Sequence, residues 1–242
     1  EDKTTFAAYT EDKRLVLKRF EKEANFLDDT QFTIKEKKHE IVVEGASQLT
    51  NVKLDIDQRE LYLVDDKGFV YYYDVQNLDK PRLIQKIKAV PTGVDITSFE
   101  FLTGGISVLI GRSDGQIDQW FPVRDKDNNY TLHNVRSFNA QSSPIIAIAP
   151  EQARKGFLTL DKTGQLGIYH TTAHRTLLVE PYVDSEAVIG LSPRANGLIS
   201  MTDNGDVKLL DIRNEHPDIS WHSLWEKVWY ESRDQPEYIW QS

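Results

Sequence analysis

Two histidines, His170 and His174, have the four-residue spacing that places a pair of zinc ligands on one face of a helix. A helical zinc pair of that kind carries a glutamate between its histidines, but here two threonines and an alanine lie between them. The pair also follows an apolar run that is typical of a strand. A surface loop is therefore the favoured interpretation, and we expect no metal at this position.

Residues 125–129 read Asp-Lys-Asp-Asn-Asn, which imitates the opening of a calcium-binding loop. Such a loop needs a glycine at its sixth position and a bidentate glutamate at its twelfth, and these positions hold Tyr130 and Arg136. The segment therefore predicts a polar hairpin tip. Residues 129–131 also match the N-glycosylation sequon, a short pattern that chance alone produces often.

The motifs of nucleophilic and nucleotide chemistry are missing from the sequence. It has no Gly-x-Ser-x-Gly elbow, phosphate-binding loop, dinucleotide fingerprint or cysteine. Residues 103–105, Thr-Gly-Gly, are interpreted as a turn before a strand, and the tandem acids Asp28-Asp29 and Asp65-Asp66 are expected in turns where water solvates their charge. We therefore expect no catalytic residue, no cofactor and no metal, and the chain is not expected to be an enzyme.

Composition restricts the partners of this 242-residue chain. Its 29 basic and 38 acidic residues leave a net charge of −9, which argues against nucleic acid, because nucleic acid requires patches of Lys and Arg. No run of about 18 apolar residues is present, so no membrane-spanning helix is expected within these residues. A chain of this length buries roughly 70% of its surface on folding, which is enough for a core without disulfides.

A repeat organises the chain. In four places an apolar run is followed by a short polar turn that ends in glycine, and a second apolar run begins two residues later. The glycines are Gly68, Gly115, Gly164 and Gly205, and the runs before them are Leu61–Val64, Ile106–Ile110, Phe157–Leu160 and Leu198–Met201. Each unit predicts a β-hairpin whose glycine supplies the positive φ that the turn needs.

The spacing of the repeat indicates its architecture. Successive glycines are 47, 49 and 41 residues apart, and each unit has a further apolar segment upstream, which matches a four-stranded propeller blade. An N-terminal hairpin, Phe6–Tyr9 and Leu15–Leu17, adds part of a fifth unit without the glycine. We therefore predict an all-β, propeller-like array of about five four-stranded, WD-repeat-like units over residues 1–213. An ordinary antiparallel sandwich is the alternative.

Residues 214–242 differ in composition from the repeats. They contain four of the five tryptophans and no glycine, and they predict a short C-terminal amphipathic helix. One face of that helix would hold Trp221, Leu224, Trp225, Val228 and Trp229. Either this face packs on the β-domain, or it lies at a membrane interface, where tryptophan is enriched. We treat the five residues as a possible docking or membrane-proximal face.

Residues Glu215–Glu231 and Pro236–Ser242 closely resemble a stretch of the long-form, PstC-type permease subunit of bacterial phosphate ABC transporters. The resemblance implies a non-catalytic domain on the periplasmic side of the inner membrane, inserted between transmembrane helices that are not part of these residues. It implies docking or regulation in phosphate uptake, with other transporter subunits or the periplasmic phosphate-binding protein as partners. The β-repeats resemble that family only in place and size.

Two other classes of protein compete with this interpretation. A free-standing WD-repeat-like interaction scaffold is weakened because only two units, at Asp74 and Asp211, keep the expected aspartate, and no Gly-His pair precedes a unit. A propeller enzyme of the quinoprotein type would need a polar, cation-binding funnel that the sequence does not indicate. Long apolar segments on both sides of the coding region would select the permease.

Overall fold

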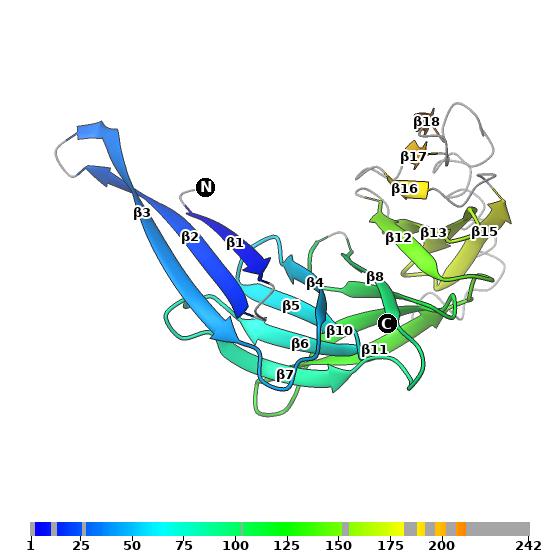
Figure 1. The fold of residues 1–242 in the computed structure, drawn as a ribbon, viewed down its shortest axis with the longest axis horizontal. Helices are drawn as coiled ribbons and strands as arrows, with labels where there is room; N and C mark the ends of the chain where they lie inside the picture. Colours follow the sequence, from blue (N-terminus) through cyan, green and yellow to red (C-terminus); the bar gives the residue numbers. More distant parts are fainter. Residues whose placement is uncertain are drawn as a thin grey trace. The chain divides into compact units, whose positions relative to one another are not determined.

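The computed structural model describes residues 3–10, 14–25, 28–102, 104–151, 155–181, 188–191, 197–201 and 207–211. Every regular element in these residues is a β-strand, and each sheet is built from strands that follow one another in the chain (Figure 1). The described residues divide into two compact units. The first takes its residues from 1–95 and 123–132, and the second from 96–122 and from 133 onward.

The first unit contains two antiparallel sheets. The three-stranded sheet has the order β1-β2-β3, with β1 (Lys3–Tyr9), β2 (Arg14–Asn25) and β3 (Asp28–Val42). The four-stranded sheet has the order β4-β5-β6-β7, with β4 (Leu49–Leu54), β5 (Glu60–Asp65), β6 (Phe69–Asp74) and β7 (Arg82–Lys88). One core lies between the sheets and includes Leu15, Leu17, Leu61, Leu63, Tyr71 and Tyr73.

The second unit continues the same pattern. Its strands are β8 (Ile96–Phe101), β9 (Val108–Arg112), β10 (Ile117–Arg124), β11 (Tyr130–Phe138), β12 (Ile145–Pro150), β13 (Gly156–Asp161), β14 (Gln165–His170), β15 (Arg175–Pro181), β16 (Val188–Leu191), β17 (Gly197–Met201) and β18 (Val207–Asp211). They pair as β11-β10-β9-β8, β12-β13-β14-β15 and β16-β17-β18. The turn between β10 and β11, with the strand ends beside it, belongs to the first unit. In the core, the rings of Phe157 and Tyr169 stack with centroids 5.0 Å apart.

The glycine hairpins have the backbone that the sequence predicts. Gly68, Gly115 and Gly164 have φ of 75°, 81° and 84°, and each donates its amide hydrogen to the carbonyl of the residue three positions earlier. Asp161 stabilises its turn further, because its Oδ1 accepts hydrogen bonds from the amides of Thr163 and Gln165, both at 2.9 Å. The fourth predicted glycine, Gly205, lies outside the described residues.

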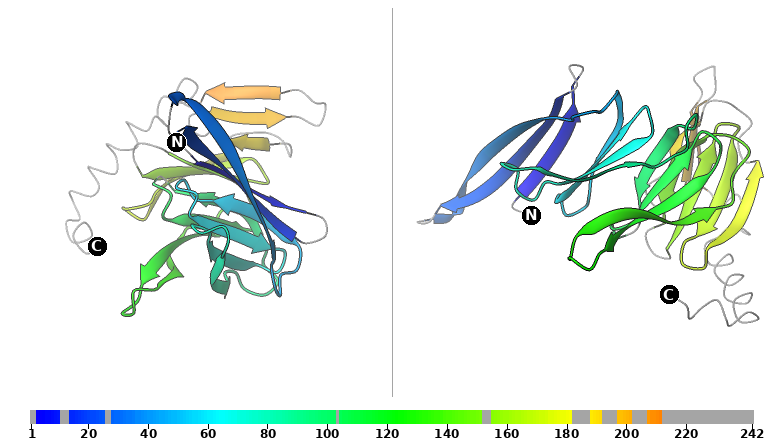
Figure 2. Two further views of the ribbon diagram at one scale, coloured as in Figure 1. Left: turned by 90° about the vertical axis from the view of Figure 1, so that its left-hand side faces the viewer. Right: turned by 90° about the horizontal axis from the view of Figure 1, so that it is seen from below.

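The structure also departs from the sequence prediction in two ways. The outer strands β7, β11 and β15, which complete the four-stranded sheets, have no distinct apolar pattern and were not located individually. The expectation of a turn at Asp28-Asp29 is wrong, because both residues belong to the 15-residue strand β3. The backbone of β3 pairs with β2 along its length, and charged cross-strand pairs accompany that ladder, among them Lys35 with Glu23 at 2.6 Å and Lys18 with Glu36 at 2.8 Å. Figure 2 shows the long, twisted β2–β3 ribbon that results.

Candidate functional site

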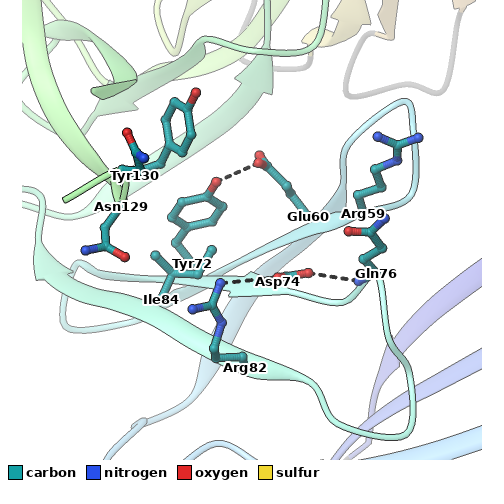
Figure 3. Close-up of a pocket in the computed structure, with 10 residues that line it drawn as sticks. Arg59, Glu60, Tyr72, Asp74, Gln76, Arg82, Ile84, Asn129 and Tyr130 are labelled. Atoms are coloured by element: carbon teal, nitrogen blue, oxygen red, sulfur yellow. Dashed lines mark hydrogen bonds and ion pairs between the residues drawn. The ribbon is translucent and has the colours of Figure 1, made fainter. Parts of the chain in front are cut away.

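A polar pocket of about 220 Å³ opens in the first unit, lined by residues from β5, β6 and β7, from the segments beside them and from the β10–β11 turn (Figure 3). Tyr72 lies at its centre, with Asn129 and Tyr130 on one side and Glu60 and Arg59 on the other. All of these residues belong to one compact unit. We therefore regard this pocket as the candidate site.

Glu60 positions the aromatic wall of the pocket. Its Oε1 accepts a hydrogen bond from the Tyr72 hydroxyl at 2.6 Å, and its Oε2 accepts one from the Tyr62 hydroxyl at 2.9 Å. The two tyrosine rings stack with centroids 4.8 Å apart, because the residues face each other in the β5–β6 ladder. One carboxylate at the start of β5 thus holds two buried tyrosines in a fixed orientation.

Two guanidinium groups, Arg59 beside Glu60 and Arg82 on β7, also line the pocket. Arg82 Nη2 lies 3.4 Å from Asp74 Oδ2, and Asp74 Oδ1 also accepts a hydrogen bond from the backbone amide of Gln76 at 3.0 Å. Arg59 is exposed beside Gln76. With Glu60 as the second acid, the two arginines and the two carboxylates balance, so the lining has no net charge.

The β10–β11 turn supplies the third wall. Asp125 Oδ1 accepts hydrogen bonds from the amides of Asp127 and Asn129, both at 2.8 Å, and Asn128 has a φ of 65°. This is the polar hairpin tip that the sequence predicts. The side chain of Gln85 on β7 holds the following strand, because its Oε1 accepts the amide hydrogen of Leu132 at 2.7 Å.

The two tyrosine hydroxyls of this pocket are neutral. Burial is the main cause that raises the pKa of Tyr62 and of Tyr72 well above the usual range, and Glu60 adds to it, so both hydroxyls stay protonated at neutral pH. Both hydroxyl hydrogens are donated to Glu60, so the polar groups that the lining leaves for a ligand are exposed side chains such as Arg59, Gln76 and Asn129. The described residues contain no group of three or more His, Asp and Glu side chains placed to hold a metal ion.

The expectation of a surface loop at the histidine pair is wrong for His170, which is a buried strand residue. His170 ends β14 and is only 3% exposed, and its Nδ1 accepts a hydrogen bond from the amide of Ala173. His174 lies in the next turn with a φ of 51°, and its Nε2 donates to the carbonyl oxygen of Ser137 at 2.8 Å.

The predicted helix with Trp221, Leu224, Trp225, Val228 and Trp229 lies outside the described residues. None of the described residues forms a helix long and apolar enough to cross a membrane.

Two buried charges had no signal in the sequence. The Arg19 guanidinium, in a residue only 8% exposed, donates to Thr5 Oγ1 and to the carbonyl oxygens of Gln58, Val75 and Gln76, at 2.9–3.2 Å. It thereby joins the two sheets of the first unit. In the second unit, Asp118 accepts hydrogen bonds from Arg112 at 3.0 Å and from the Ser137 hydroxyl at 2.6 Å. Neither charged residue belongs to the pocket lining, although Arg19 contacts the backbone of Gln76, which does.

Comparison with known proteins finds no family model and no curated protein that matches the chain. Among solved structures, it is similar to one described as the crystal structure of the computationally designed Ika4 protein. The TM-score is 0.54 at 18% sequence identity, over 69% of this chain and 94% of that one. At this identity the likeness concerns the fold alone, an all-β fold of repeated antiparallel sheets.

Proposed function

We propose that this chain is the periplasmic domain of a phosphate ABC transporter permease, and that it docks or regulates without catalysing a reaction. The observation that carries the proposal is the resemblance of residues 215–231 and 236–242 to the long-form permease subunit. The pocket agrees with a non-catalytic role, because its two buried tyrosines are protonated and Arg82 is paired with Asp74.

We further propose that the repeated sheets form a propeller-like array. Three observations support this architecture: the four-stranded sheets follow the chain order, three hairpin glycines recur at equivalent turns, and first strands of successive sheets lie together within each unit. The last point rests on contacts of β1 with β4 in the first unit, and of β12 with β8 and β16 in the second. Such an array provides a rigid platform for another protein.

The proposed partners are other transporter subunits or the periplasmic phosphate-binding protein. Direct phosphate binding by the described pocket is disfavoured, because Arg59 and Arg82 are offset by Glu60 and Asp74, and a divalent anion needs an excess of donors and positive charge. The proposal therefore places phosphate recognition elsewhere in the transporter. Titration of the chain with inorganic phosphate should release no binding heat.

The decisive experiment deletes the coding segment for this chain in the cells that carry it. We expect the uptake of radiolabelled phosphate to change, while sulfate uptake, the matched control, stays the same. The reading frame around the segment should encode long apolar stretches on both sides. Unchanged phosphate uptake would contradict the proposal, and a reading frame with a start codon or another soluble domain beside the segment would favour the interaction scaffold.

A further inference from the structure

The three-stranded sheet has one face that the first unit leaves uncovered. Ala7, Leu15, Leu17 and Ile41 point into the core shared with β4–β7. Because side chains alternate along a strand, the residues between them point to the opposite face. Large apolar side chains on that face are well exposed: Phe6 at 56%, Phe32 at 53%, Ile34 at 65% and Val42 at 70%. We call this surface the outer face of the β1–β3 sheet.

Four of its apolar residues form a stripe across all three strands. The rings of Phe6 on β1 and Phe20 on β2 meet edge to face at 5.9 Å. Phe32 and Ile34 on β3 pair with Ala24 and Lys22 of β2. Because Phe20 pairs with Glu36, Ile34 is its diagonal neighbour on β3, and the stripe of Phe6, Phe20, Ile34 and Phe32 crosses the sheet obliquely.

Positive charge accompanies the stripe. Among the described side chains of this face, Arg14, Lys18, Lys22 and Lys38 are basic, and only Glu36 and Glu40 are acidic. The face thus carries +2 in a chain whose net charge is −9. Lys22 lies next to the apolar stripe, with its ammonium 4.2 Å from the centre of the Phe32 ring.

A second sheet is a poor occupant for such a face. The surface of β5 and β6 that the β1–β3 sheet does cover presents Leu61, Leu63, Tyr71 and Tyr73, all at most 6% exposed. A sheet packed on the outer face would instead bury the ammonium groups of Lys18 and Lys22, at the cost of removing them from water. The mixture of phenylalanine and lysine therefore indicates a partner that receives both.

We infer that the outer face of the β1–β3 sheet binds the surface of an anionic phospholipid bilayer. Phe6, Phe20, Phe32 and Ile34 enter the boundary between headgroups and acyl chains, as the apolar faces of interfacial segments do. The stem of Lys22 lies along the apolar surface while its ammonium group reaches the lipid phosphates. The surface binds a bilayer whether or not the chain serves phosphate transport, so this inference goes beyond the proposed function.

Vesicle co-sedimentation of the full chain tests the inference. We expect binding to phosphatidylglycerol–phosphatidylcholine vesicles, weaker binding to phosphatidylcholine alone, and a loss of binding as salt is added. The double variant Phe32→Ser, Ile34→Ser and the variant Lys22→Glu should each lower the partition coefficient about tenfold. Matched controls are Ile56→Ser, at an exposed apolar residue of the same unit, and Lys80→Glu, at an exposed lysine.

Each alternative has its own outcome. Binding by the stripe variants as strong as that of the original chain would overturn the inference and assign the membrane contact to another surface, such as the tryptophan-rich segment. No binding to either kind of vesicle would also overturn it. If sedimentation velocity showed a dimer that only the stripe variants dissociate, the outer face would instead be an interface between two copies. Circular dichroism of every variant checks that the fold is retained.

Discussion

Replacing Gly115 with alanine should destabilise the second unit far more than the same change at Gly104. Both glycines have positive φ, 81° and 94°, a conformation that costs an L-residue about 1–2 kcal/mol. Their surroundings differ. A Cβ on Gly104 would meet nothing within 4 Å, whereas a Cβ on Gly115 would collide with the backbone carbonyl of Gln141 and approach the Ser143 carbonyl oxygen at 3.1 Å.

The collision sets the size of the effect, because Gln141 cannot move freely. Its amide donates to the carbonyl of Gly115 at 3.0 Å, its side-chain nitrogen donates to the carbonyl of Gln165 at 3.0 Å, and its side-chain oxygen accepts from Thr159. Weakening these three hydrogen bonds costs about 0.5–1.5 kcal/mol each. We therefore expect Gly115→Ala to lower the free energy of unfolding by about 3–5 kcal/mol, and Gly104→Ala by about 1 kcal/mol.

Urea unfolding followed by circular dichroism measures both variants against the unsubstituted chain. A gap of about 2–4 kcal/mol between the two alanine variants is the expected result, since the strain of positive φ is common to both. Equal losses would refute the reasoning, because they would mean that the Gln141 backbone gives way at no cost. In that case the backbone amide of Gln141 should exchange its hydrogen equally fast in the unsubstituted chain and in the Gly115→Ala variant.

Two further changes probe the buried polar groups. Arg19→Met removes a guanidinium that donates to three carbonyl oxygens, and it should lower the free energy of unfolding in urea by about 2–4 kcal/mol. The control Arg14→Met, at an exposed ion pair on the same strand, should lower it by less than about 1 kcal/mol. Similar losses in the two variants would contradict this expectation. Raising the pH should destabilise the fold, because burial raises the pKa of Tyr169 to about 12 and also raises those of Tyr62 and Tyr72. The folded values exceed the unfolded value of about 10, so this stability is complete below pH 10 and is lost as the pH rises toward 12; a Tm that stays constant between pH 10 and 12 would refute it.

The sequence was informative where burial and turn chemistry act together. The apolar runs before Gly68 and Gly164 lie within β5 and β13, and the run before Gly115 begins two residues before β9, because these strands lie inside their sheets and bury most of their side chains. The turns follow from the same segments, since each needs a residue that tolerates positive φ. Both signals, the apolar run and the turn glycine, lie within one short segment, so the sequence alone is enough to detect them.

Elsewhere the sequence lacked a signal. In β3, the charged residues from Lys35 to Glu40 give no strand signal, because nearly all of them are exposed and backbone pairing with β2 holds the strand. The pocket was not predicted for a different reason. It depends on the packing of Tyr62 against Tyr72 and on the approach of the β10–β11 turn to β7, and neither spacing nor composition reveals such tertiary contacts.

The pairing of every described strand with its neighbour in sequence bears on how the chain folds. Each sheet closes only short loops, so the entropy lost in forming one sheet does not depend on segments that come much later. Chains with such local contacts fold faster than those that must join distant segments, and stacked units add stability one at a time. During synthesis, the β1–β3 sheet can therefore form before β4 has left the ribosome, and the pairing within β4–β7 can be complete before β12 exists.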